Sequence, residues 1–141
     1  MTLPQPGTDL RFRLQISGID LGDFTACSGL GARVEADPQP GDGGSFVPQT
    51  PVRITYPNVT LSRVLTADTA KVSRFLAKLP GRVARSSARI TAVVPAPGAV
   101  PVLATWALRE VVVVRWTGPG DDSAQGGVAT ESIELAHQGF L

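Results

Sequence analysis

Alternation of apolar and polar residues dominates this chain and predicts β-strands. Phe12, Leu14 and Ile16 fall on one face of a strand that begins at Arg11, because successive side chains of a strand point to opposite faces. The same alternation recurs at residues 24–28, 52–56, 59–63 and 88–94. Because a proline and an asparagine separate the second of these stretches from the third, we read residues 52–63 as one strand bent at the proline. The pattern indicates a mostly antiparallel β protein.

A long hairpin forms the last part of the predicted sheet. Residues 104–116 are mostly apolar and include four consecutive valines, which we expect to be buried on both faces or covered by a neighbouring subunit. The stretch from residue 128 places Ile133 and Leu135 on one face. Residues 117–127 between the two strands are rich in glycine and aspartate, as in a long hairpin loop. We expect the strands that precede this hairpin in the chain to pack against it.

One stretch has the period of a helix instead. Its apolar residues recur at the spacing i, i+3, i+4 and i+7, with lysine and arginine off the stripe. The stripe consists of Val72, Phe75, Leu76 and Leu79. We expect the Asp68 carboxylate to cap the helix, because it can accept from backbone N–H groups of the first turn. Pro80 and Gly81 end the helix.

Residues 37–51 interrupt the strands. The segment holds four prolines and three glycines, which cannot contribute much to a sheet, so we expect it to project from the domain. Phe46 and Val47 lie near its middle and favour an arm that a partner covers. Residues 1–9 are expected to form a flexible lead. The chain as a whole, residues 1–141, is predicted to be one all-β domain, a sandwich or small barrel of mostly antiparallel strands with one flanking α-helix.

Composition narrows the possible functions. Charged residues make up 18% of the chain and the net charge is +1, whereas a sequence-independent nucleic-acid binder needs a concentrated excess of lysine and arginine. The single cysteine, Cys27, allows no internal disulfide, and we interpret it as a small buried hydrophobe. No signal peptide or membrane span is predicted. We therefore expect assembly in the cytoplasm and no membrane binding by this chain itself.

Few residues look catalytic. His137 is the one histidine and the natural candidate, because histidine titrates near neutral pH. It has no second histidine or cysteine with which to share a metal, and Glu134, three residues earlier, lies on the opposite face of a strand. We interpret His137 as a structural or interface residue and predict no enzyme activity, metal or cofactor.

Three segments together form a distinctive combination. The first is FRLQISGIDLGDFTACSGLGARVE (residues 12–35), and the second is YPNVTLSR (56–63). The third is RWTGP (115–119), followed after the glycine and aspartate loop by ATESIELAHQGF (129–140). This combination resembles the phage tail tube proteins, the family that also builds the inner tubes of bacterial contractile injection systems. The resemblance covers residues 11–141.

The resemblance implies a structural subunit of an inner tube, built from stacked hexameric rings around a lumen through which cargo passes. It also implies that residues 37–51 form an arm that reaches onto neighbouring subunits, with Gly43, Gly44, Phe46 and Val47 as assembly residues. The implied partners are other copies of the chain, a sheath protein, baseplate and spike components, and a protein cargo. The particle that they form can be released from the cell.

Strand charges suggest further assembly residues. Five arginines occupy positions that we expect on the polar sides of strands, namely Arg11, Arg13, Arg53, Arg63 and Arg89. We hypothesise that some of them pair across subunit joints with strand glutamates, chiefly Glu35, Glu110, Glu131 and Glu134. Such pairs would leave a weakly charged lumen. With His137, the residues Arg63, Glu131 and Glu134 are our candidates for the joints.

Other functions stay open at this point. Within the family, the chain could be a baseplate tube initiator rather than the repeating tube subunit. Outside it, a ligand- or carbohydrate-binding β-sandwich would use Trp106, Trp116 and Tyr56 as stacking platforms. A hydrolase using His137 is a further alternative. A monomer in light scattering at high concentration would favour the binding module, and lost activity with unchanged assembly after His137→Ala would favour the hydrolase.

Overall fold

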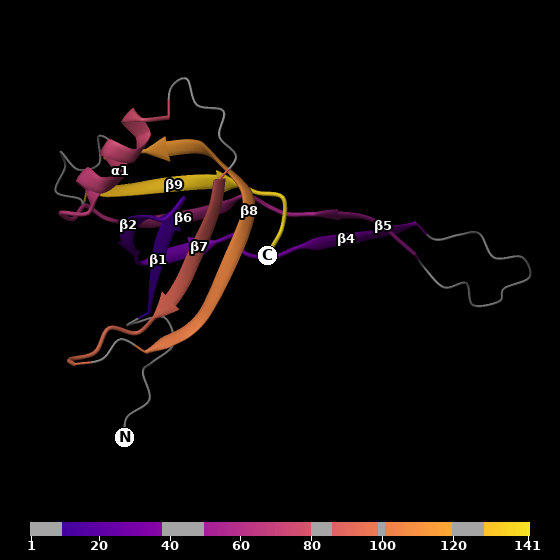
Figure 1. Ribbon diagram of the computed structural model, residues 1–141, viewed down its shortest axis with the longest axis horizontal. Coiled ribbons are helices and arrows are strands. Elements are labelled where there is room, and N and C mark those ends of the chain that lie inside the picture. The colour runs from indigo at the N-terminus through magenta and orange to yellow at the C-terminus, as the bar shows by residue number, and fades with distance from the viewer. Residues whose placement is uncertain (1–9, 38–49, 80–85, 99–100, 120–128) are drawn as a thin grey trace, which may run out of the picture.

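The computed structural model describes residues 10–37, 50–79, 86–98, 101–119 and 129–141. Seven strands form one antiparallel sheet in the order β2-β1-β7-β8-β9-β6-β3, and β4 and β5 pair separately (Figure 1). The strands are β1 (Arg11–Ile16), β2 (Ile19–Phe24), β3 (Ala26–Ser28), β4 (Arg33–Asp37), β5 (Thr50–Thr55), β6 (Val59–Val64), β7 (Ser86–Val93), β8 (Val102–Thr117) and β9 (Thr130–Ala136). The helix is α1 (Thr69–Ala77). The predicted fold class, mostly antiparallel strands with one helix, is confirmed for the described residues.

The sheet closes on itself. Its two edge strands, β2 and β3, are separated in the chain only by Thr25, whose backbone N–H donates to the carbonyl of Ser62 at 2.9 Å. One bent segment therefore pairs with β1 on one side and with β6 on the other. This shared segment joins the two ends of the sheet into a small barrel, while β2 and β3 each have a strand partner on one side only among the described residues.

β8 spans both halves of the barrel. Residues 102–111 pair with β7, and residues 112–117 pair with β9. Glu110 lies between the two halves with a positive φ of 52°. The chain after β9 continues along β8, because the Arg109 N–H donates to the Gly139 carbonyl and the Leu141 N–H donates to the Ala107 carbonyl, both at 2.9 Å. One curved strand thus binds β7, β9 and the last residues of the chain.

The core fills the barrel with the inward residues of the alternating strands. These buried side chains are Leu14, Ile16, Leu21, Phe24, Val59, Leu61, Ala88, Ile90, Leu108, Val111, Ile133 and Leu135. α1 lies beside the start of β9 and the end of β8 (Figure 1), and adds Val72 and Phe75 to this core. Leu76 and Leu79 pack against it, so the predicted apolar stripe is confirmed.

The start of α1 differs from the prediction. Asp68 occupies the N-cap position, but its side chain makes no capping hydrogen bond and instead pairs with Lys71 Nζ at 3.0 Å. Threonines hold the turn: Thr66 Oγ1 accepts from the Asp68 N–H, and Thr69 Oγ1 accepts from the Thr66 N–H, each at 3.1 Å. The expected Asp68 cap is therefore wrong, because the carboxylate is engaged by a lysine one turn further on.

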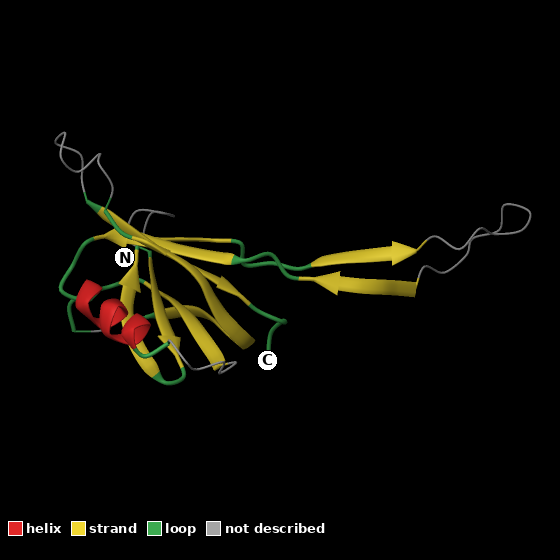
Figure 2. Cartoon of the chain, turned by 90° about the horizontal axis from the view of Figure 1, so that it is seen from above, coloured by secondary structure: helices red, strands yellow, loops and turns green. Residues whose placement is uncertain are grey.

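β4 and β5 form a two-stranded ribbon, called the arm below, that projects from the barrel on the side away from α1 (Figure 2). The prediction of one bent strand over residues 52–63 is wrong. Pro57 and Asn58 separate β5, which belongs to the arm, from β6, which belongs to the barrel. Residues 1–9 and 38–49 lie outside the described residues, and so do Gly43, Gly44, Phe46 and Val47.

No helix in the described part of the chain is long and apolar enough to cross a membrane.

We expect Phe75→Ala to lower the free energy of unfolding by about 3–5 kcal/mol, because it leaves a cavity where a large side chain packs in the core. Lys71→Ala on the same helix removes only an exposed ion pair and should cost less than about 1 kcal/mol. Urea unfolding followed by circular dichroism measures both. Equal losses in the two variants would mean that Phe75 does not anchor the helix.

Candidate assembly site

A buried ion pair joins β6 to β9. Arg63 and Glu131 lie directly opposite each other in the two strands, with Arg63 Nε 3.0 Å from Glu131 Oε2. Each residue is only 2% exposed, and each continues the inward alternation of its strand. Because removing charges from water is costly, such a pair persists only where further hydrogen bonds satisfy both groups.

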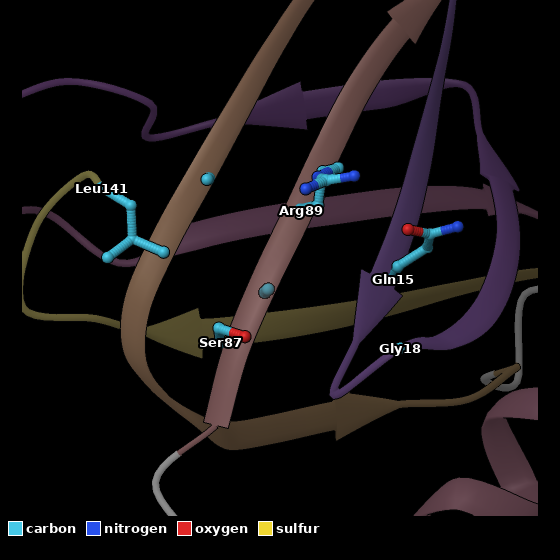
Figure 3. Close-up of a pocket in the computed structure, with 7 residues that line it drawn as sticks. Gln15, Gly18, Ser87, Arg89 and Leu141 are labelled. Atoms are coloured by element: carbon cyan, nitrogen blue, oxygen red, sulfur yellow. The ribbon is translucent and has the colours of Figure 1, made fainter.

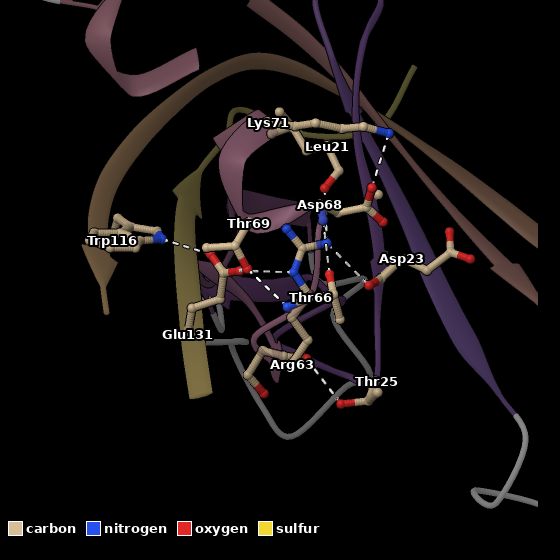
Figure 4. A network of polar contacts seen from close by, with 12 residues as sticks. Leu21, Asp23, Thr25, Arg63, Thr66, Asp68, Thr69, Lys71, Trp116 and Glu131 are labelled. Carbon is tan, nitrogen blue, oxygen red and sulfur yellow. Dashed lines mark hydrogen bonds and ion pairs between the residues drawn. The ribbon is translucent and has the colours of Figure 1, made fainter. Parts of the chain in front are cut away.

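Glu131 receives three side-chain donors from three elements. Besides Arg63, the Thr69 hydroxyl of α1 donates to Oε2, and Trp116 Nε1 of β8 donates to Oε1 at 3.0 Å (Figure 4). Burial raises the pKa of Glu131, but the hydrogen bonds from Thr69, Trp116 and Arg63, together with the charge of Arg63, outweigh it and lower the pKa overall. The carboxylate is therefore held ionised and fixes the helix against the sheet.

Arg63 reaches across the barrel to β2. Its Nη1 donates to the carbonyl oxygens of Leu21 at 2.9 Å and Asp23 at 3.2 Å, and its guanidinium lies 4.1 Å from the ring centroid of Phe24. Gly22 makes this approach possible, because a Cβ there would lie 2.7 Å from Nη1, and its φ is +92°. One arginine thus ties β6 to β9 and to the edge strand β2.

The hypothesis that some strand arginines pair across subunit joints is wrong for Arg63 and stays a prediction for the other four. Arg63 was expected on the polar side of its strand but lies inside the barrel, where it pairs with Glu131 of the same chain. Arg53 and Arg13 also have partners within the chain, but at the surface: Arg53 Nη2 lies 3.0 Å from Glu35 Oε2, and Arg13 Nε lies 2.9 Å from Asp23 Oδ1. A charge reversal at Arg63 would test folding rather than assembly.

His137 lies in a ring cluster at the base of the arm. The residue is 4% exposed, and its ring centroid is 5.3 Å from that of Tyr56 and 5.5 Å from that of Phe140. Nδ1 accepts from the Gly139 N–H at 3.1 Å, and Nε2 has no hydrogen-bond partner among the described residues. Because Tyr56 directly follows β5, the cluster connects the arm to the end of β9. His137 has a structural place here, and its role in assembly stays a prediction.

Glu134 lies on the outward side of β9 and accepts from Asn58 Nδ2 at 2.7 Å. Its role in a joint also stays a prediction. Of the four candidate assembly residues in the described part of the chain, the structure therefore brings together Arg63 and Glu131.

The stacking platform of the binding-module hypothesis does not exist as expected. Trp106 and Trp116 are partly buried against the core, and Tyr56 packs in the ring cluster with His137, so each of the three rings has a packing role within the subunit. Burial raises the pKa of the Cys27 thiol to about 11, which favours the inert thiol over a reactive one. The described residues contain no group of three or more potential ligands for a metal ion.

Comparison with known families supplies the identity. The model of the T4-like virus tail tube protein gp19 family matches residues 8–141, nearly the whole chain. The chain belongs to this family. It is therefore a member of a family of tail tube structural proteins, which are not enzymes. A comparison with curated protein sequences gave no match.

Solved structures show the same tail tube fold. A chain from the sheath/tube terminator of the extracellular contractile injection system PVC, in its extended state, has a TM-score of 0.73 at 17% identity, with 99% of this chain and 96% of that chain covered. A chain from the PVC sheath-tube complex has a TM-score of 0.70 at 18% identity, covering 93% and 86%. A chain from the anti-feeding prophage cap has a TM-score of 0.69 at 21% identity, covering 100% and 91%.

One feature of the sequence predicts the buried ion pair of this tail tube protein. Arg63 is in phase with Val59 and Leu61, and Glu131 is in phase with Ile133 and Leu135, so alternation alone puts both charges on the inward face. Opposite charges at two inward positions of neighbouring strands predict a buried pair. The ring cluster around His137 had no comparable local signal.

We expect Arg63→Met to lower the free energy of unfolding by about 3–5 kcal/mol, because Glu131 is then buried without its cation. The double variant Arg63→Met/Glu131→Leu should recover most of the loss, since no buried charge remains unpaired. Arg53→Met, which breaks the exposed pair with Glu35, is the matched control and should cost less than about 1 kcal/mol. A double variant no more stable than Arg63→Met would contradict the pairing.

Protonation of Glu131 should account for part of the loss of folding stability at acidic pH. The pKa of Glu131 is lower in the folded chain than in the unfolded chain. The ionised carboxylate therefore contributes its full stabilisation above the pKa of the unfolded chain, about 4.3, and this contribution is lost as the pH falls through the pKa of the folded chain. Glu131→Gln cannot ionise and should show a smaller loss of stability below about pH 4.5. Urea titrations from neutral to acidic pH measure this, and parallel curves for the two proteins would rule out the contribution of Glu131.

Proposed function

We propose that the chain is the repeating subunit of the inner tube of a contractile injection system, assembling as stacked hexameric rings around a hollow lumen. Family membership supports the tube, and likeness to a chain of the PVC sheath-tube complex supports the repeating role. The observation that carries the proposal is the arm, because it exposes an apolar face that a partner would cover.

The arm has an apolar face without cover. Val34 and Ile54 are direct cross-strand partners, so they lie on one face, and they are 57% and 49% exposed. Glu35 and Arg53 pair on the other face. A two-stranded ribbon alone is marginally stable in water. Contact of its apolar face with a neighbouring copy would bury this pair and fix the direction of the arm.

β8 carries a second uncovered apolar surface. Among its four consecutive valines, Val111 is buried, but Val112 and Val114 point outward and are 47% and 48% exposed. The expectation of burial on both faces therefore fails within one subunit. Cover by a neighbouring copy is what we propose for the outward face.

The remaining partners follow from the same assignment. A sheath protein around the tube, and baseplate and spike components at its end, are proposed because similar chains occur in the PVC sheath-tube complex and in the anti-feeding prophage baseplate. Passage of a protein cargo and release of the particle from the cell belong to this proposal too.

A second candidate is the tube terminator. Similar chains occur in the PVC sheath/tube terminator and in the anti-feeding prophage cap, and the baseplate likeness equally supports a tube initiator. A terminator or initiator forms one ring and stops, whereas a tube subunit adds ring upon ring. Electron microscopy of the purified protein separates these roles.

We expect Val34→Ser/Ile54→Ser to prevent tube formation, because it removes the apolar contact of the arm while leaving the barrel core intact. Glu35→Ser/Arg53→Ser on the opposite face of the same ribbon is the matched control and should still form tubes. Negative-stain electron microscopy records assembly, and thermal unfolding records the fold. Normal tubes from the apolar variant would overturn the proposed role of the arm.

A further inference from the structure

A row of three residues crosses the outer face of the barrel. Gln15 of β1 pairs in register with Arg89 of β7, which pairs with Ala107 of β8. Their chain neighbours Leu14, Ile90 and Leu108 are buried in the core, so the row points outward. Figure 3 shows the side chains of Gln15 and Arg89 beside each other on this face.

A pocket of about 200 Å³ lies along this row. Ala107 leaves space above β8 because its side chain is a single methyl group. Leu141 bounds the pocket on one side and is held there by its N–H bond to the Ala107 carbonyl. Ser87 lines it on β7, and the β1–β2 turn is fixed beside it by the bond from the Ser17 N–H to the Ser87 carbonyl at 2.9 Å.

Arg89 is a cation on this face without a partner among the described residues. Its side chain is exposed and makes no hydrogen bond or ion pair with any residue in the described part of the chain. By contrast, Arg13 pairs with Asp23, and Arg109 Nε donates to the Gln138 carbonyl at 3.0 Å. None of the described residues that line the pocket is an aspartate or a glutamate. The pocket therefore presents free guanidinium donors, with a serine hydroxyl and a glutamine amide beside them.

We propose that this pocket is a carboxylate-binding site, in which Arg89 binds an aspartate or glutamate side chain of another polypeptide. The planar guanidinium matches a carboxylate with two parallel hydrogen bonds. The Ser87 hydroxyl and the Gln15 amide supply further donors at the rim. A nucleic acid fits less well, because the described residues of the lining include one cation and no aromatic side chain for stacking on bases.

Binding of a fluorescein-labelled hexaglutamate peptide, followed by anisotropy at low salt, tests the site on the whole chain. Arg89→Gln should weaken binding roughly tenfold or more, the loss expected for a charge-assisted bidentate contact. Arg74→Gln, which removes an exposed arginine from α1, is the matched control and should change affinity by less than about twofold.

A second variant blocks the site instead of removing its cation. Ala107→Glu places a carboxylate directly across from Arg89, where it should occupy the guanidinium and abolish peptide binding. Wild-type affinity in both Arg89→Gln and Ala107→Glu would overturn the proposal. Tighter Arg89-dependent binding of oligothymidylate than of hexaglutamate would also overturn it, in favour of a phosphate site.

Assembly of the same variants identifies the source of the carboxylate. Loss of rings or tubes in both Arg89→Gln and Ala107→Glu, with normal thermal unfolding, supports the site and assigns the carboxylate to a second copy of this chain. Normal assembly with lost peptide binding supports the site and assigns the carboxylate to a different protein. The site does not rest on the proposed function, since the peptide measurement applies whether or not the chain forms tubes.

Discussion

The buried ion pair between Arg63 and Glu131 connects four strands of the barrel and the helix. Charges inside a protein are tolerated only when their remaining hydrogen-bonding groups are satisfied. Here Thr69 of α1 and Trp116 of β8 satisfy the glutamate, while backbone carbonyls of β2 satisfy most of the arginine. The helix, the long shared strand and the closing edge of the barrel are therefore positioned by one pair of side chains.

The way the sheet closes limits where other copies can bind. The two ends of the sheet are joined through Thr25, although β2 pairs only with β1 and β3 only with β6 among the described strands. The other surfaces available to a partner include the apolar face of the arm, the outward valines of β8 and the polar face around Arg89. We expect such a subunit to assemble through its projecting ribbon and the outer faces of its strands. The ring cluster at His137 fixes the base of the ribbon to the barrel.

The sequence predicted what depends on local periodicity. Strands β1 and β7 and the apolar stripe of α1 follow directly from alternation and helical spacing. The partners of the charges did not follow, because Arg63 and Glu131 are 68 residues apart and charge alone suggested a surface position. The His137 cluster was equally hidden, since it forms only when the end of the chain pairs along β8. The assignment of residues 52–63 to one strand failed because two collinear strands can belong to different sheets.

Cryo-electron microscopy of the purified, assembled protein can show whether this subunit builds a tube by laying its arm on a neighbouring copy. We expect stacked hexameric rings around an open channel, with the Val34 and Ile54 face of each arm buried against the next copy. A particle whose arms stand in solvent, or a protein that stays monomeric at high concentration, would contradict it.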